Sequence, residues 1–137
     1  MRVLIAAAAV AVALTGPLAA QDAGPDNAIE GVISGQMQAF RSGDVAAAWA
    51  FASPTIKQLF GTQDRFAQMV QRGYPMVWQP GDVQFLELRE IGGKQWQKVM
   101  VRDGDNVFHI LDYEMIETES GWQIDAVQLL PAPQIGA

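Results

Sequence analysis

Apolar residues in the first half of the chain recur every three or four positions, which is the spacing of amphipathic helices. The first apolar stripe begins at Asn27 and Glu30, a pair that matches a capping box, and ends before Gly43. Two shorter stripes cover 44–52 and 62–73, and a serine followed by a proline between them is typical of one further helical turn. The pattern therefore predicts three helices and an additional turn.

In the second half of the chain the pattern changes to strand-like segments that are separated by glycine-bearing turns. The predicted strands are Val83–Ile91, Lys94–Arg102, Asn106–Glu117 and Trp122–Leu130. Short turns favour antiparallel hairpins, and no crossover helix fits between the segments, which argues against parallel strands. We therefore predict an α+β domain in which three N-terminal helices pack on a curved four-stranded antiparallel meander.

The turn between the second and third predicted strands determines which residues share a face of the sheet. A two-residue turn at Asp103-Gly104 pairs Lys98 with His109. A slip of one residue exchanges the two faces, so the face that lines a pocket stays open at this stage.

The paired helices, with Gln38-Ala39-Phe40 and Gly43-Asp44, and the meander after them resemble the nuclear-transport-factor-like superfamily, the cystatin-like α+β cones. The runs 51–54, 73–78 and 109–122 are similar to the bacterial family numbered 4864 among domains of unknown function. The resemblance implies helices folded over a strongly curved sheet. It assigns no activity, because the superfamily includes isomerases, dehydratases, polyketide cyclases and binding domains on one scaffold.

The first twenty residues have the pattern of a secretory signal peptide. A positive start is followed by an unbroken apolar run from Val3 to Leu14, and then by a helix break and small residues up to Ala20. The apolar run is shorter than the roughly 20 residues that a spanning helix needs. We expect a signal peptide over 1–20, a polar leader over 21–26, one α+β domain over 27–131 and a flexible tail over 132–137. The mature protein is then periplasmic or secreted, with no membrane contact.

Charge and cysteine content exclude several classes of partner. The chain of 137 residues has a formal net charge of −6, and its lysines and arginines are dispersed, so nucleic acid is disfavoured. Cysteine is absent, which excludes disulfides and thiolate metal sites. No zinc, phosphate-loop or dinucleotide motif is present, so the sequence predicts neither a metal nor a cofactor.

Three residues of the third predicted strand are candidates for catalysis, and the pattern assigns a role to none of them. His109 is the only histidine and can act as an acid or base near neutral pH. Asp112 suits proton transfer if it is buried, and Tyr113 can donate a hydrogen bond. A hydrogen-bonded strand histidine and a solvated carboxylate are the structural alternatives.

The segment between the helices and the sheet is unusually apolar and carries two aromatic residues, Tyr74 and Trp78. With His109 and Tyr113 they are the candidate ligand-binding residues, able to close the mouth of a cone over an apolar molecule. Core packing or a dimer seam explains the same aromatic residues without a ligand.

Three functions are compatible with these features. The first is an exported, non-enzymatic domain that binds a small apolar molecule or a protein partner. The second is an isomerase-like or dehydratase-like enzyme with His109 or Asp112 as base and Tyr113 as hydrogen-bond donor. The third is a homodimeric assembly subunit.

Overall fold

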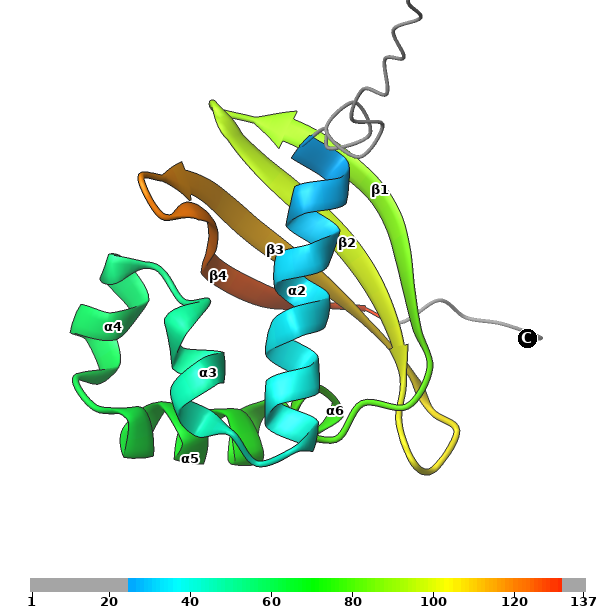
Figure 1. The fold of residues 1–137 in the computed structure, drawn as a ribbon. Coiled ribbons are helices and arrows are strands. Elements are labelled where there is room, and N and C mark those ends of the chain that lie inside the picture. Colours follow the sequence, from blue (N-terminus) through cyan, green and yellow to red (C-terminus); the bar gives the residue numbers. More distant parts are fainter. Residues whose placement is uncertain (1–24, 132–137) are drawn as a thin grey trace, which may run out of the picture.

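The computed structural model describes residues 25–131, so the expected signal peptide, most of the expected leader and the tail over 132–137 lie outside the described residues. In this part of the chain five helices are followed by four strands (Figure 1). The helices are α2 (Pro25–Arg41), α3 (Val45–Ala50), α4 (Pro54–Phe60), α5 (Gln63–Gly73) and α6 (Pro75–Trp78), and the strands are β1 (Val83–Ile91), β2 (Lys94–Arg102), β3 (Phe108–Thr118) and β4 (Gly121–Leu130). No helix among them has the length and apolar character that crossing a membrane requires.

A Schellman motif ends α2 and leads directly into α3. The N–H of Gly43 donates to the carbonyl oxygen of Phe40 at 3.0 Å, and the N–H of Asp44 donates to that of Ala39 at 2.8 Å. Gly43 has a φ of 75°, a conformation that favours glycine. The Asp44 carboxylate then accepts the N–H of Ala47 at 3.1 Å and caps α3. The predicted helix end and the predicted cap are both confirmed.

The start of α2 differs from the prediction. The helix begins at Pro25, so Asn27 lies inside its first turn and the predicted helix start is wrong. Proline suits the first turn because its φ is preset, and Asp26 adds a negative charge where the helix dipole favours one. The other starts are confirmed, because Ser53 and Thr62 cap α4 and α5. The connection to the sheet contains a short helix, α6, that the pattern did not predict.

The strands form one antiparallel sheet in the order β1-β2-β3-β4, which confirms the predicted meander. Strands β1 and β2 have the predicted bounds, and β3 begins at Phe108 rather than at Asn106. The helices cover the concave face of this curved sheet, with α3, α4 and α5 gathered at the end near β4 (Figure 1). The predicted α+β class is therefore confirmed.

The predicted pairing of Lys98 with His109 is wrong, because the loop between β2 and β3 is longer than a two-residue turn. The loop runs from Asp103 to Val107, and the N–H of Asp103 donates to the carbonyl oxygen of Val107 at 2.9 Å. As a result Lys98 lies opposite Asp112.

This register decides which residues of β2 share a face of the sheet with which residues of β3. The alternate residues that point toward α2 are buried in the core, namely Val99, Val101, Leu111, Tyr113 and Met115. Their neighbours Lys98 and Asp112 point to the opposite side, because successive side chains of a strand alternate. Tyr113 therefore lies on the helix-covered face and Asp112 on the opposite face.

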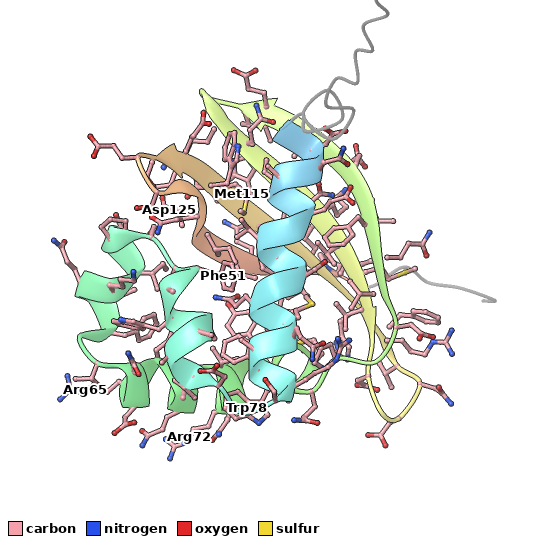
Figure 2. All side chains as sticks on the ribbon, in the orientation of Figure 1. Phe51, Arg65, Arg72, Trp78, Met115 and Asp125 are labelled. Carbon is pink, nitrogen blue, oxygen red and sulfur yellow. The ribbon has the colours of Figure 1, made fainter. Side chains whose placement is uncertain are left out.

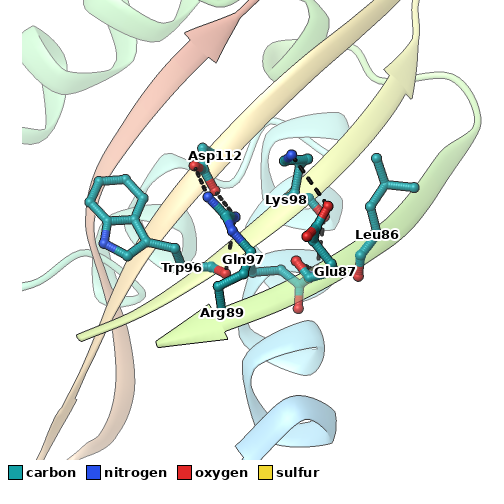
Figure 3. Close-up of polar contacts among 7 residues, drawn as sticks. All are labelled: Leu86, Glu87, Arg89, Trp96, Gln97, Lys98 and Asp112. Carbon is teal, nitrogen blue, oxygen red and sulfur yellow. Dashed lines mark hydrogen bonds and ion pairs between the residues drawn. The ribbon is translucent and has the colours of Figure 1, made fainter. Parts of the chain in front are cut away.

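A β-bulge between Phe85 and Leu88 bends strand β1. The side chain of Gln97 on β2 fills it, and its amide N–H groups donate to the carbonyl oxygens of Leu86 at 3.0 Å and of Lys98 at 2.9 Å (Figure 3). Only 1% of Gln97 is exposed. Its amide thus satisfies main-chain oxygens that the bulge removes from the regular ladder.

We expect Gln97→Met to lower the free energy of unfolding by about 1–3 kcal/mol, because the carbonyl oxygens of Leu86 and Lys98 lose their donor while the side-chain volume changes little. Urea unfolding measures this change. Gln84→Met, at an exposed position of β1, is the matched control and should change stability much less. Equal effects of the two substitutions would contradict the role given to Gln97.

Candidate functional site

A cavity of about 300 Å³ lies between the helices and strands β3 and β4. Most of its wall is apolar. The apolar wall includes Ile56 and Phe60 of α4, Phe66 and Val70 of α5, and Ile124 of β4. Polar groups come from five residues, namely Gln36, Thr55, Tyr74, Tyr113 and Asp125. A mostly apolar wall with a few polar groups is the usual construction of a small-molecule site.

Tyr113 lies in the middle of β3 with its side chain completely buried. Tyr113 is one of the residues that line the cavity, and its buried hydroxyl has no hydrogen-bond partner among the described residues. A buried polar group without a partner costs roughly 1–3 kcal/mol. Burial, and then the neighbouring Tyr74, raise the pKa of Tyr113 above its ordinary value. The hydroxyl therefore keeps its proton and can donate a hydrogen bond to a molecule in the cavity.

Two other polar groups of the wall already have partners in the protein. The hydroxyl of Tyr74 donates to the carbonyl oxygen of Val127 at 3.0 Å and joins α6 to β4. The side-chain amide of Gln36 on α2 donates to the carbonyl oxygen of Ala48 at 3.1 Å. Both residues shape the wall; the hydroxyl proton of Tyr74 is engaged, and so is one of the two N–H groups of the Gln36 amide.

Asp125 is set at a bulge of β4, where the pairing with β3 shifts by one residue. One oxygen of its carboxylate accepts the hydroxyl of Ser53 at 2.7 Å, and the other lies 3.4 Å from the Lys94 ammonium. The Ser53 oxygen also accepts the N–H of Ile56 and so caps α4. Asp125 thus places one negative charge at the cavity wall and ties that wall to the start of α4.

The cavity opens beside α4. Leu59 of that helix belongs to the wall, yet 71% of it is exposed. No residue of α4 is fully buried, whereas Tyr113 at the sheet has no exposed surface. The cavity therefore runs from the sheet toward α4.

Trp78 and His109 were predicted near a ligand, and neither lines this cavity. The ring of Trp78 packs against Phe40 of α2 with centroids 5.3 Å apart, at the lower end of the helices in Figure 2. His109 lies at the start of β3, where its Nε2 meets a carboxylate oxygen of Asp103 at 2.7 Å. The loop that holds Asp103 lies across the molecule from α4 (Figure 1).

Asp112 is buried on the opposite face of the sheet, in a two-pronged ion pair with Arg89 of β1 (Figure 3). Each of its oxygens accepts from one guanidinium nitrogen at 2.8 Å. The bond spans β2 and fixes β1 relative to β3. The three catalytic candidates therefore do not meet: Tyr113 faces the cavity, Asp112 faces away from it, and His109 joins a loop.

Sequence reasoning missed Gln36 as a residue of the wall. A signal existed, because Gln36 occupies a position in the otherwise apolar stripe of α2. The wall position of Asp125 depends on the β4 bulge, which no pattern of the strand reveals. Among residues 25–131, acidic and histidine side chains form no group of three that could hold a metal ion.

The fold belongs to the class of α+β cones. It is similar to the crystal structure of an NTF-2-like protein of unknown function from Shewanella oneidensis MR-1, with a TM-score of 0.51 and 16% sequence identity. The similarity covers 77% of this chain and 98% of that chain. At this identity the likeness concerns the fold alone, and it agrees with the predicted nuclear-transport-factor-like architecture.

The sequence relationship is more specific than the fold. Residues 23–137 match the family described as a domain of unknown function, DUF4864, and the chain belongs to that family. The resemblance noted in the sequence is thereby confirmed. The search of curated proteins found no match for the chain.

Asp103 organises the loop between β2 and β3. One carboxylate oxygen accepts the N–H groups of Asp105 at 2.8 Å and Val107 at 3.0 Å, and the other accepts from His109. These hydrogen bonds, that of His109 first, lower the pKa of Asp103 below its ordinary value. Because the pKa of Asp103 is lower in the folded than in the unfolded state, its ionised carboxylate stabilises the folded protein. This stabilisation is complete above the pKa of the unfolded state, roughly pH 4, and is lost as the pH falls through the pKa of the folded state.

We expect Asp103→Asn to melt at a lower temperature than the wild type near neutral pH, and the difference to shrink as the pH falls below about 4. Thermal unfolding at several pH values measures both effects. Asp105→Asn in the same loop is the control, because the described part of the chain offers its carboxylate no donor. A difference that stays constant from neutral to acid pH would show that the charge of Asp103 is not involved.

Proposed function

We propose that this protein binds a small, mostly apolar molecule in the cavity between its helices and the curved sheet. The observation that carries the proposal is that Tyr113, a residue of this mostly apolar wall, has a buried hydroxyl without a partner among the described residues. The volume of about 300 Å³ is at the lower end of the roughly 300–1,000 Å³ common for ligand sites, so the ligand is small.

The surroundings of the cavity support binding rather than catalysis. Asp112 is held by Arg89 on the opposite face, and His109 is bonded to Asp103 away from the wall. The candidate base and the candidate donor of the enzyme hypothesis are therefore not within reach of one bound molecule. A mostly apolar wall with a few polar groups is suited to holding a molecule, which is the first of the three functions considered above.

The fluorescent probe N-phenyl-1-naphthylamine tests this proposal, because its emission rises in an apolar site. We expect saturable binding to the wild type and at least about tenfold weaker binding to Met69→Trp, since the larger ring of that variant fills the cavity. Met100→Trp is the matched control, because Met100 is half-buried outside the core cluster and does not line the cavity.

Circular dichroism establishes that both variants are folded. Equal affinity of the wild type and Met69→Trp, with Met100→Trp unchanged, would place the probe elsewhere and end the proposal. Absence of any saturable binding to the wild type would end it as well.

We also propose that the chain is exported and that residues 1–20 are removed. The support is the sequence pattern of a positive start, an apolar run and small residues before Gln21. Expression of the full chain in a Gram-negative host, followed by fractionation and mass spectrometry, should give a periplasmic product that begins near Gln21. Ala8→Arg, which interrupts the apolar run, should leave an uncleaved product in the cytoplasm.

Gly31→Arg is the control for export, because it adds the same charge at an exposed position of α2 with no atom within 4 Å of an added Cβ. Export should be retained in that variant. Retention of the wild-type chain at full length in the cytoplasm would refute the export proposal without touching the binding proposal.

A further inference from the structure

The two ends of the cavity differ in chemistry, which gives a bound molecule a direction. The deep end is formed by the sheet, where Tyr113 has no exposed surface. The open end is formed by α4, where Leu59 is 71% exposed. The unpartnered buried hydroxyl thus lies at the sheet end, and the α4 end combines apolar side chains with Thr55 and the Asp125 carboxylate.

The deep end calls for an acceptor that carries no proton of its own. The Tyr113 hydroxyl has a proton to donate, whereas Tyr74 and Gln36 already donate to main-chain carbonyl oxygens. A ligand alcohol would bring a second proton that needs an acceptor of its own, for which the wall offers the side-chain oxygens of Gln36 and Tyr74. A carbonyl oxygen accepts the Tyr113 proton and leaves no donor unsatisfied.

The charges at the wall disfavour an anionic head group. No lysine or arginine lines the cavity, and Asp125 already places a carboxylate there. The ammonium of Lys94 is shared between Asp125 and Glu114 outside the wall. A carboxylate ligand would therefore be buried without a cation and close to a like charge.

We propose that the ligand is a neutral, mostly apolar molecule with one carbonyl group, which enters head first so that its oxygen accepts a hydrogen bond from Tyr113 while its apolar part extends toward Leu59. This inference rests on the proposed binding function and specifies the chemical class that the cavity takes. It is motivated by the buried unpartnered hydroxyl, the engaged neighbours and the absence of cationic side chains from the described wall.

Competition against bound N-phenyl-1-naphthylamine tests the class with three molecules of one ring system and similar size: 2-acetylnaphthalene, 2-isopropylnaphthalene and 2-naphthoate. For the wild type we expect the ketone to displace the probe at about five- to tenfold lower concentration than the hydrocarbon, and the carboxylate to be the weakest. In Tyr113→Phe the advantage of the ketone over the hydrocarbon should disappear, while the hydrocarbon binds as before.

Tyr74→Phe is the matched control, because it removes a hydroxyl from the same wall that is already bonded to Val127. That variant should keep the preference for the ketone. Tyr113→Phe should fold, because it removes a hydroxyl that has no partner among the described residues, and a melting temperature equal to or above that of the wild type verifies this.

Several results would overturn the inference. Equal displacement by the ketone and the hydrocarbon in the wild type would do so, and this comparison needs no variant. A ketone preference that persists in Tyr113→Phe, or tightest binding of the carboxylate, would do so as well. In these cases the probe still binds, so the proposed function stands, whereas a probe that never binds overturns the proposed function and this inference together.

Discussion

The cavity depends on hydrogen bonds between the loop after α3 and a bulge in β4. The N–H of Ser53 donates to the carbonyl oxygen of Ile124 at 2.8 Å, and the N–H of Ile124 donates to that of Phe51 at 2.9 Å. The bulge leaves Asp125 beside these bonds, and its carboxylate accepts the Ser53 hydroxyl. Because Ser53 also caps α4, that helix is fixed over one end of the sheet although none of its residues is fully buried. The space between α4 and β4 follows from this attachment.

The buried polar groups on the two faces of the sheet differ in whether they have a hydrogen-bond partner. On the outer face Asp112 is fully satisfied by Arg89, and the bond holds two strands together. Among described residues, two buried side-chain atoms lack a partner: the Arg102 Nε and the Tyr113 hydroxyl. Arg102 is nevertheless paired through another nitrogen with Asp82 at 3.4 Å, whereas the hydroxyl is the only polar atom of Tyr113. The uncompensated polar group of the core therefore belongs to a residue of the cavity wall.

Membership of the DUF4864 family and the α+β cone describe a scaffold, and the chemistry must come from the particular wall of this chain. That wall combines a deep donor, apolar sides and one carboxylate near α4. The three catalytic candidates of the sequence, His109, Asp112 and Tyr113, lie at separate places in the fold. The histidine and the aspartate of this strand are each bonded to another side chain of the protein, His109 to Asp103 and Asp112 to Arg89.

The sequence by itself determined the helix and strand segments, the antiparallel meander and the family, because caps, glycine turns and apolar periods act within a few residues. It did not determine the register of β2 and β3. The Asp103-Gly104 pattern predicts a two-residue turn, whereas the structure has a five-residue loop over 103–107. The hydrogen bonds of Asp103 hold this loop and so set the register. That register put Val99 and Val101 on the face of Tyr113, and Lys98 on the face of Asp112. The bulge of β1, which bonds to Gln97 of β2, and the bulge of β4 at Asp125 likewise involve contacts between distant segments. Local patterns thus specified the elements, and only long-range hydrogen bonding decided which side chains meet at the cavity.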